Sequence, residues 1–242
     1  MSERRARDRF RDVLGPEAMN NAECNSVAGA RLLLLICVLA VTGCQRQTQV
    51  VSRGPAVPPN PTVKPLPDNA SPQLKQMLGG AIAQAGVTTG YDPSYVALDY
   101  PGGDVPESTG VCSDVVVRAF RKAGIDLQKE VHEDMKAARS EYPNKWGATK
   151  TDRNIDHRRV LNLMTYFTRQ GKSLPISHSA TDYQPGDIVA WELTNGIDHI
   201  GIVTNMLSES EDRYLIVHNI GAGTRIEDVL FAWTIKGHYR FF

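Results

Sequence analysis

The sequence has little cysteine, no surplus of charge of either sign and no long apolar run. Its 242 residues include four cysteines, and 27 basic residues balance 27 acidic ones. Proteins that bind nucleic acid normally carry a basic surplus, so we do not expect nucleic acid as a partner. No HExxH spacing and no internal repeat is present, and cysteine is too scarce for a typical zinc site. We therefore expect no metal and no other cofactor.

The apolar run Leu32–Val41 is too short for a comfortable membrane span, which needs about 20 apolar residues. It follows the basic Arg31 and ends in small residues, as a secretory signal peptide does. The tetrapeptide that ends at Cys44 resembles a bacterial lipobox, in which the cysteine is diacylated and becomes the N-terminus. An ordinary signal peptide or an uncleaved anchor is the alternative.

We therefore expect a leader and signal peptide over residues 1–43 and a membrane anchor on Cys44. Gln45 follows the cysteine in place of Asp, which by resemblance to bacterial sorting signals favours the outer membrane. The charged leader is long, and Met19 would give a signal of more usual length than Met1.

Residues 44–70 are rich in proline and almost free of aromatic side chains. Such a segment buries too little surface to fold and prefers extended conformations. We expect it to be a tether, and we expect the folded domain to cover residues 71–242.

The pattern of the folded part changes from helical to strand-like along the chain. Helical spacing predicts helices from Ser71 to about Ala85, Ser113 to about Ala123, Leu127 to about Ser140 and Asp156 to about Gln170. Short β-branched or aromatic runs predict strands at 187–191, 199–203, 214–218 and 238–241. Helices followed by strands indicate the α+β class, with a helical half packed on an antiparallel sheet.

Cys112 is expected to be the only thiol of the mature protein, because the leader holds Cys24 and Cys37 and Cys44 is lipidated. It lies where a helix begins, and the positive end of a helix favours a thiolate nucleophile and an oxyanion. The alternative is a small buried hydrophobe, since Cys112 shares an apolar stripe with Val115. Export favours the nucleophile, because an idle thiol there is a liability.

His199 begins an alternating strand, with the small Gly201 beside it, and is the predicted general base. His218 ends the next strand, and neighbouring antiparallel strands place such residues side by side. We therefore predict that His218 orients the base. Asp198 and Asn219 are competing orienters, although strand alternation turns each to the opposite face from its neighbouring histidine.

The order of Cys112, a Pro185-Gly186-Asp187 turn, the Asp198–Val203 strand and His218 resembles the NlpC/P60 branch of the papain-like hydrolases. This resemblance implies hydrolysis of amide bonds in peptidoglycan stem peptides. It also implies Cys112 as nucleophile, His199 as base and His218 as orienter. Tyr100 stands where that family often has a tyrosine at the oxyanion site.

The chain from residue 91 to residue 242 also resembles the bacterial family DUF1287. The blocks that carry this resemblance are residues 100–106, 131–135, 154–159 and 218–221. Asp104 and Asn219 lie within them and are predicted, with Tyr100, to contact substrate or oxyanion.

The insert between Cys112 and His199, residues 125–185, is longer than usual for NlpC/P60 enzymes. It carries Arg158 and Arg159, which we predict to bind stem-peptide carboxylates in bidentate fashion. A solvated or capping helix start is the alternative for this pair.

The sequence thus predicts a lipid-anchored cysteine hydrolase on the periplasmic side of the cell envelope, acting on peptidoglycan peptides. Two other functions stay open. One is a non-catalytic lipoprotein that binds peptidoglycan or a partner, and the other is a papain-like acyltransferase or lipid-processing enzyme.

Overall fold

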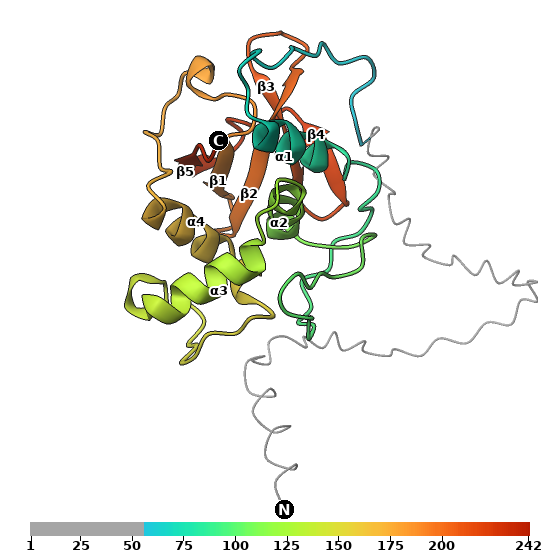
Figure 1. The fold of residues 1–242 in the computed structure, drawn as a ribbon. Coiled ribbons are helices and arrows are strands. Elements are labelled where there is room, and N and C mark those ends of the chain that lie inside the picture. Colours follow the sequence, from blue (N-terminus) through green and yellow to red (C-terminus); the bar gives the residue numbers. More distant parts are fainter. Residues whose placement is uncertain (1–55) are drawn as a thin grey trace, which may run out of the picture. The chain divides into compact units, whose positions relative to one another are not determined.

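The computed structural model describes residues 56–242, so the predicted signal peptide and Cys44 lie outside the described residues. Four α-helices come first in the chain and five strands follow (Figure 1). The helices are α1 (Pro72–Ile82), α2 (Cys112–Lys122), α3 (Leu127–Ala137) and α4 (Val160–Arg169). The strands are β1 (Ile188–Glu192), β2 (Asp198–Leu207), β3 (Tyr214–Asn219), β4 (Thr224–Glu227) and β5 (Thr234–Tyr239). No helix within residues 56–242 is long and apolar enough to cross a membrane.

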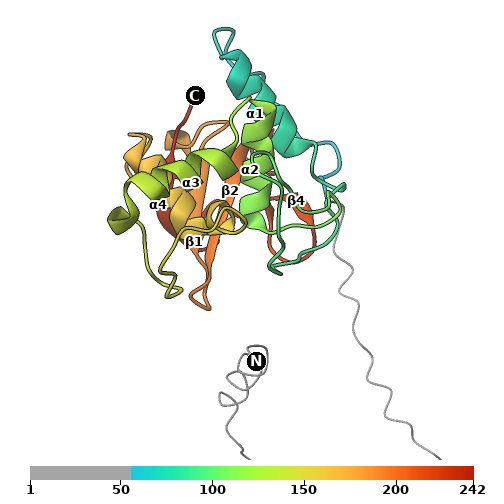
Figure 2. The ribbon, with the colours of Figure 1, turned by 60° about the horizontal axis from the view of Figure 1, so that its bottom comes forward.

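The strands form one antiparallel sheet in the order β4-β3-β2-β1-β5, with β2 at its centre. The helices gather on one face of this sheet (Figures 1 and 2). This arrangement confirms the predicted α+β class, with a helical half packed on an antiparallel sheet.

Alternation along the strands produces two separate apolar clusters. Ile200 and Ile202 of β2 point toward the helices and join the main core with Val115 and Phe120. Val203, one residue further along, belongs to a second cluster on the other face. The second cluster consists of Tyr183, Val189, Trp191, Val203, Ile216 and Leu230. Residues of odd and even number in β2 therefore face different surroundings, which decides where a side chain at position 199 lies.

The helix predicted from Asp156 is interrupted. Asp156–Arg158 form a single 3₁₀ turn, Arg159 is extended (φ −101°, ψ 119°), and α4 begins only at Val160. The Arg158 carbonyl accepts a hydrogen bond from Ser113 Oγ in α2 instead of an amide of the following turn. A tertiary contact thus outweighs the helical pattern of the segment.

Two strands differ from the prediction. The last strand begins at Thr234 and not near His238, and β4 was not predicted at all. β4 has only four residues, with Ile226 as its one large apolar side chain. Pairing with β3 stabilises it, and that pairing is not visible in so short a pattern.

Residues 56–70, which we call the N-terminal strap, lie along the domain and are not a free tether. The Ala56 carbonyl accepts a hydrogen bond from the Ile226 amide at 2.8 Å. The strap also pairs with β2, since Leu207 N donates to Thr62 O and Lys64 N donates to Asn205 O, each at 2.9 Å. These backbone hydrogen bonds attach the strap to the domain that was expected to begin at residue 71.

Candidate active site

Cys112 is the first residue of α2, and its side chain is buried. Asp114, in the same first turn, accepts a hydrogen bond from the Val111 N–H at 2.7 Å. A carboxylate at this place satisfies one of the free amide groups that precede a helix and lies at its positive end. The sequence around Cys112 thus fixes the start of the helix locally.

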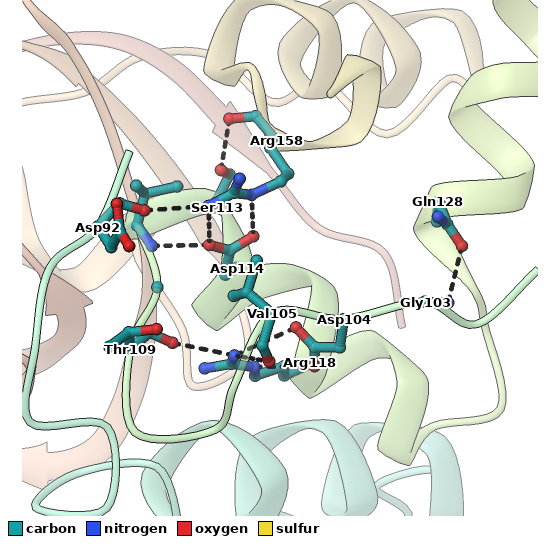
Figure 3. A network of polar contacts seen from close by, with 12 residues as sticks. Asp92, Gly103, Asp104, Val105, Thr109, Ser113, Asp114, Arg118, Gln128 and Arg158 are labelled. Atoms are coloured by element: carbon teal, nitrogen blue, oxygen red, sulfur yellow. Dashed lines mark hydrogen bonds and ion pairs between the residues drawn. The ribbon is translucent and has the colours of Figure 1, made fainter. Parts of the chain in front are cut away.

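A buried ion pair ties this helix start to the insert (Figure 3). Arg158 Nε and Nη2 lie 2.9 and 3.0 Å from the two carboxylate oxygens of Asp114. Its other donors bond the backbone carbonyls of Ser94 and Asp92. These protein partners engage the Arg158 guanidinium, so Arg158 positions α2. The sequence predicted that Arg158 would bind a substrate carboxylate, and in the structure the carboxylate of Asp114 takes that place.

Burial raises the pKa of the Cys112 thiol to about 12, although a hydrogen bond from the Ile200 backbone opposes the shift. The negative charge of Asp114 adds to the increase. The sequence predicted that the helix start would favour a thiolate. The loss of solvation outweighs the effect of the helix end, and the thiol is protonated at neutral pH.

The two predicted histidines lie side by side on β2 and β3, as expected. His199 Nε2 is 2.8 Å from His218 Nδ1. His218 Nε2 is in turn 3.0 Å from Glu227 Oε2 on β4, and Arg225 Nε bonds the other Glu227 oxygen at 3.2 Å. Three neighbouring strands thus supply a continuous chain of hydrogen bonds.

Glu227 determines which nitrogens of this chain carry protons. The hydrogen bond from His218 holds the pKa of Glu227 below its ordinary value, so Glu227 is an ionised acceptor. His218 Nε2 then carries the proton, its Nδ1 accepts, and His199 Nε2 donates. We infer this tautomer from the hydrogen-bond network. It leaves the Nδ1 lone pair of His199 free to act as a base.

The environment of His199 keeps it neutral. Burial, and then the neighbouring His218, lowers the pKa of His199 to about 3. Its ring packs against Trp191 and Trp233, with ring centroids 5.8 and 5.6 Å away. A neutral imidazole with a free Nδ1 is the form that a general base needs.

Cys112 and His199 approach β2 from different faces. Cys112 belongs to the core on the helix side, beside Ile200, whereas His199 lies against tryptophans on the other face. No hydrogen bond joins the thiol to His199 in residues 56–242. The thiol of Cys112 therefore lies beside Ile200, the residue after the predicted base His199, and does not contact His199 through a hydrogen bond.

A pocket of about 440 Å³ opens beside Cys112, which we call the thiol pocket. Its walls come from residues 91–93, from the insert between residues 145 and 160, and from the β1–β2 turn at residues 196–198. The tyrosine in it is Tyr91, not the predicted Tyr100. Tyr100 points elsewhere, since its hydroxyl donates to Glu133 Oε1 at 2.7 Å.

Neither competing orienter contacts a histidine. Asp198 forms an ion pair with Lys145 Nζ at 2.9 Å, across the rim of the thiol pocket. The Asn219 amide donates to the carbonyls of Gly90 and Gly110 at 3.1 and 3.0 Å. Asn219 thereby holds the two segments that lead to Tyr91 and to Cys112, and its predicted contact with substrate is replaced by a positioning contact in this structure.

The two remaining predicted substrate contacts, Asp104 and Arg159, differ in whether protein groups already bind their charged ends. Asp104 forms an ion pair with Arg118 at 2.9 Å (Figure 3). It forms a second with Arg121 at 3.1 Å, and the two pairs attach its loop to α2. Arg159 instead stacks on Trp146, with the guanidinium carbon 4.3 Å from the ring centroid. In the described part of the chain the Arg159 guanidinium donates no hydrogen bond to a protein acceptor, so its donors stay open to a ligand.

Sequence reasoning missed three residues of this site: Glu227, Tyr91 and Asp114. An acidic residue three positions after a helix cap is a known capping signal, so Asp114 was within reach of the sequence. Glu227 required the unpredicted strand β4, and Tyr91 is brought near only by the path of a long loop. Within residues 56–242, no three His, Cys, Asp or Glu side chains gather as metal ligands.

Known proteins similar to this chain include a close relative and several distant structures. The uncharacterized protein YijF of Escherichia coli strain K12 is 52% identical over 190 residues, which cover 78% of this chain and 90% of YijF. A solved structure of a protein similar to an NLP/P60-family lipoprotein, from Staphylococcus aureus, is 16% identical, with a TM-score of 0.36 over 76% of this chain and 44% of that one. A solved N-acetylmuramoyl-L-alanine amidase from Bacteroides uniformis is 14% identical, with a TM-score of 0.42 over 70% of this chain and 99% of that one. The chain thus spans less than half of the Staphylococcus protein.

A family model described as DUF1287, a domain of unknown function, matches residues 78–241. This match covers both halves of the site, from Cys112 to Glu227. Together with the identity to YijF over 90% of its length, it shows that the chain belongs to the DUF1287 family.

Proposed function

We propose that this protein is a lipid-anchored cysteine hydrolase that cleaves amide bonds in peptidoglycan stem peptides. Two observations support the proposal: the hydrogen-bonded chain of His199, His218 and Glu227, and the helix start that bears Cys112, whose thiol lies beside Ile200, the residue after His199. A nucleophile at a helix end and a base oriented by a further polar group are the parts that covalent acyl transfer requires.

The proposed reaction begins when substrate enters the thiol pocket and His199 Nδ1 takes the proton of Cys112. The sulfur then attacks the amide carbonyl carbon, and the free amides at the start of α2 stabilise the oxyanion. His199 gives the proton to the leaving amine, and the C–N bond breaks to form an acyl-enzyme. Water, deprotonated by the same imidazole, releases the acid and restores the thiol.

Glu227 and His218 assist this cycle without touching substrate. When His199 becomes an imidazolium, the His218–Glu227 pair can share its positive charge through the two hydrogen bonds. The raised pKa of Cys112 means that the thiolate forms only at the expense of a charged His199. Contact between the two groups in the substrate complex is therefore a requirement of the mechanism.

The substrate class and the location rest on sequence patterns. The NlpC/P60-like order of Cys112, His199 and His218 supports stem peptides as the substrate. The lipobox-like sequence at Cys44 supports attachment to the outer membrane on its periplasmic side. Labelled fatty acid should appear on the wild-type protein and disappear in Cys44→Ala, and label that persists in the variant would refute the anchor.

The test of catalysis is mass spectrometry of muropeptides after incubation with the full chain, as wild type and as Cys112→Ala. Wild type should release new peptide fragments and Cys112→Ala should release none. Circular dichroism of both proteins controls for folding, because Cys112 is part of the core. Equal product from both proteins would sink the proposed function.

A non-catalytic binding lipoprotein is the second candidate, favoured by one observation. The thiol is buried and has no hydrogen bond to His199 within residues 56–242. This candidate predicts that wild type and Cys112→Ala bind peptidoglycan equally and that neither cleaves it. Cleavage of acyl esters with intact muropeptides would instead indicate a lipid-processing enzyme.

A further inference from the structure

The insert holds a second pocket, of about 670 Å³, next to the thiol pocket. We call it the insert pocket. It lies over residues 147–156, with Tyr95, His132 and Arg159 completing its walls. Ile155 lines both pockets, and Trp146 of the thiol pocket stacks directly on Arg159 of the insert pocket. A ligand seated against Cys112 can therefore continue past Trp146 into the insert pocket.

Three cationic side chains line the insert pocket, namely Lys150, Arg153 and Arg159. In residues 56–242 none of them donates a hydrogen bond to a protein acceptor or lies within ion-pair distance of a carboxylate. The two arginines only stack on rings, Arg153 over Tyr100 and Arg159 over Trp146. A stacked guanidinium keeps its planar edge of donors free, which suits a bidentate carboxylate.

The carboxylates of the same pocket do not occupy these donors. Asp152 accepts hydrogen bonds at 2.9 Å from the Tyr95 hydroxyl and from the Asn154 amide, one on each oxygen. Asp156 is buried and accepts from the Asp152 amide, and burial raises its pKa even though the charge of Arg159 opposes this. His132 Nδ1 lies 3.7 Å from Asp156 and has no hydrogen bond. The cationic groups of Lys150, Arg153 and Arg159 therefore have no protein acceptor in this pocket and can bind an anion.

We propose that the insert pocket binds a carboxylate of the peptide whose amide bond lies at Cys112, with Arg159 as the specificity-determining residue. The proposal rests on the proposed function for the identity of that peptide as a substrate. It adds that the enzyme selects peptides by an acidic group placed beyond the thiol pocket, and that the insert of residues 125–185 supplies this selection.

Binding to the full chain with Cys112→Ala tests the proposal without turnover. The probes are stem peptides with free carboxylates and the same peptides with those carboxylates amidated, followed by calorimetry at low and high salt. In this background, Arg159→Gln should weaken binding of the acidic peptide on the order of tenfold, since a hydrogen bond to a charged group is lost. Arg159→Lys should keep part of the affinity, and binding of the amidated peptide should change little.

Lys75→Gln is the matched control, because Lys75 is an exposed lysine on α1 that lines neither pocket. It should leave both affinities unchanged, whereas Lys150→Gln should weaken only the acidic peptide. Equal losses for the acidic and amidated peptides in Arg159→Gln, or no binding of either peptide by Cys112→Ala, would overturn the proposal. Turnover that persists in Cys112→Ala refutes the proposed function instead, so the two failures are distinguishable.

Discussion

The histidine half of the site is built from three consecutive strands, whereas the cysteine half is built from segments far apart in the chain. His199, His218 and Glu227 come from β2, β3 and β4, and simple antiparallel pairing brings them together. Cys112 is held by α2, by the loop at residues 92–94 and by Arg158 from the insert. One half depends on strand register, and the other depends on a buried charge pair.

This difference predicts different failures. A substitution in the histidine half should alter proton positions while the sheet persists, because backbone hydrogen bonds hold the strands. A substitution in the buried pair of the cysteine half should loosen the fold itself, because it leaves one charge without a partner in the core.

The largest effect is expected for Asp114→Asn. It leaves the Arg158 guanidinium buried without its counter-charge, and breaking such a pair costs about 3–5 kcal/mol of unfolding free energy. Urea denaturation measures this loss. Asp228→Asn is the matched control, because its pair with Arg213 is partly exposed and should contribute about 0–1 kcal/mol. Equal losses in the two variants would contradict the contrast between the halves.

Glu227→Gln should lower kcat by at least about tenfold, since an amide no longer fixes the proton on His218 and His199 loses its oriented tautomer. The unfolding free energy should change by less than about 1 kcal/mol, because Glu227 is partly exposed. The kinetics with a stem-peptide substrate and urea denaturation check the two statements. Glu192→Gln, from an exposed pair with Lys236, serves as the control and should change neither quantity. A stable, fully active Glu227→Gln would remove Glu227 from the mechanism.

The pH dependence of Cys112 alkylation sharpens the comparison further. Because burial raises the thiol pKa to about 12, iodoacetamide should react slowly at neutral pH. The thiolate fraction should rise about tenfold per pH unit, with no plateau below about pH 10. Mass spectrometry of the labelled protein follows the rate. A plateau near neutral pH that vanishes in His199→Ala would show instead that the two halves already form an ion pair without substrate.

The smallest effect is expected for Lys145→Met, which removes the ion pair with Asp198 at the rim of the thiol pocket. Both side chains are partly exposed, so the unfolding free energy should fall by less than about 1 kcal/mol. The pocket should open more often, and alkylation of Cys112 should become a few-fold faster. Lys236→Met, which breaks a similarly exposed pair on the edge strand, should leave alkylation unchanged. Identical rates in the two variants would show that Lys145 does not restrict access.

The sequence predicted the histidine half well, because strand alternation and hairpin order already place His199 beside His218. It also predicted the fold class and the family. It did not reach Glu227, because β4 is too short to show a pattern. It predicted that Arg158 binds a substrate carboxylate. The sequence shows that an arginine can bind a carboxylate in bidentate fashion, but it does not show whether that carboxylate belongs to substrate or to Asp114. Tyr100 was preferred over Tyr91 on spacing alone, and the path of the loop between them decides otherwise.

The N-terminal strap limits where this domain can work. With Cys44 lipidated as proposed, only the eleven residues 45–55 would separate the lipid from the strap, because residues 56–70 are fastened to the sheet. Fully extended, such a chain spans at most about 40 Å, so the proposed anchor would hold residue 56 within that height of the bilayer. An anchored molecule of this kind searches a thin layer in two dimensions. The density of molecules on the membrane, and not their concentration in the periplasmic volume, would then set how often a strand of peptidoglycan meets the thiol.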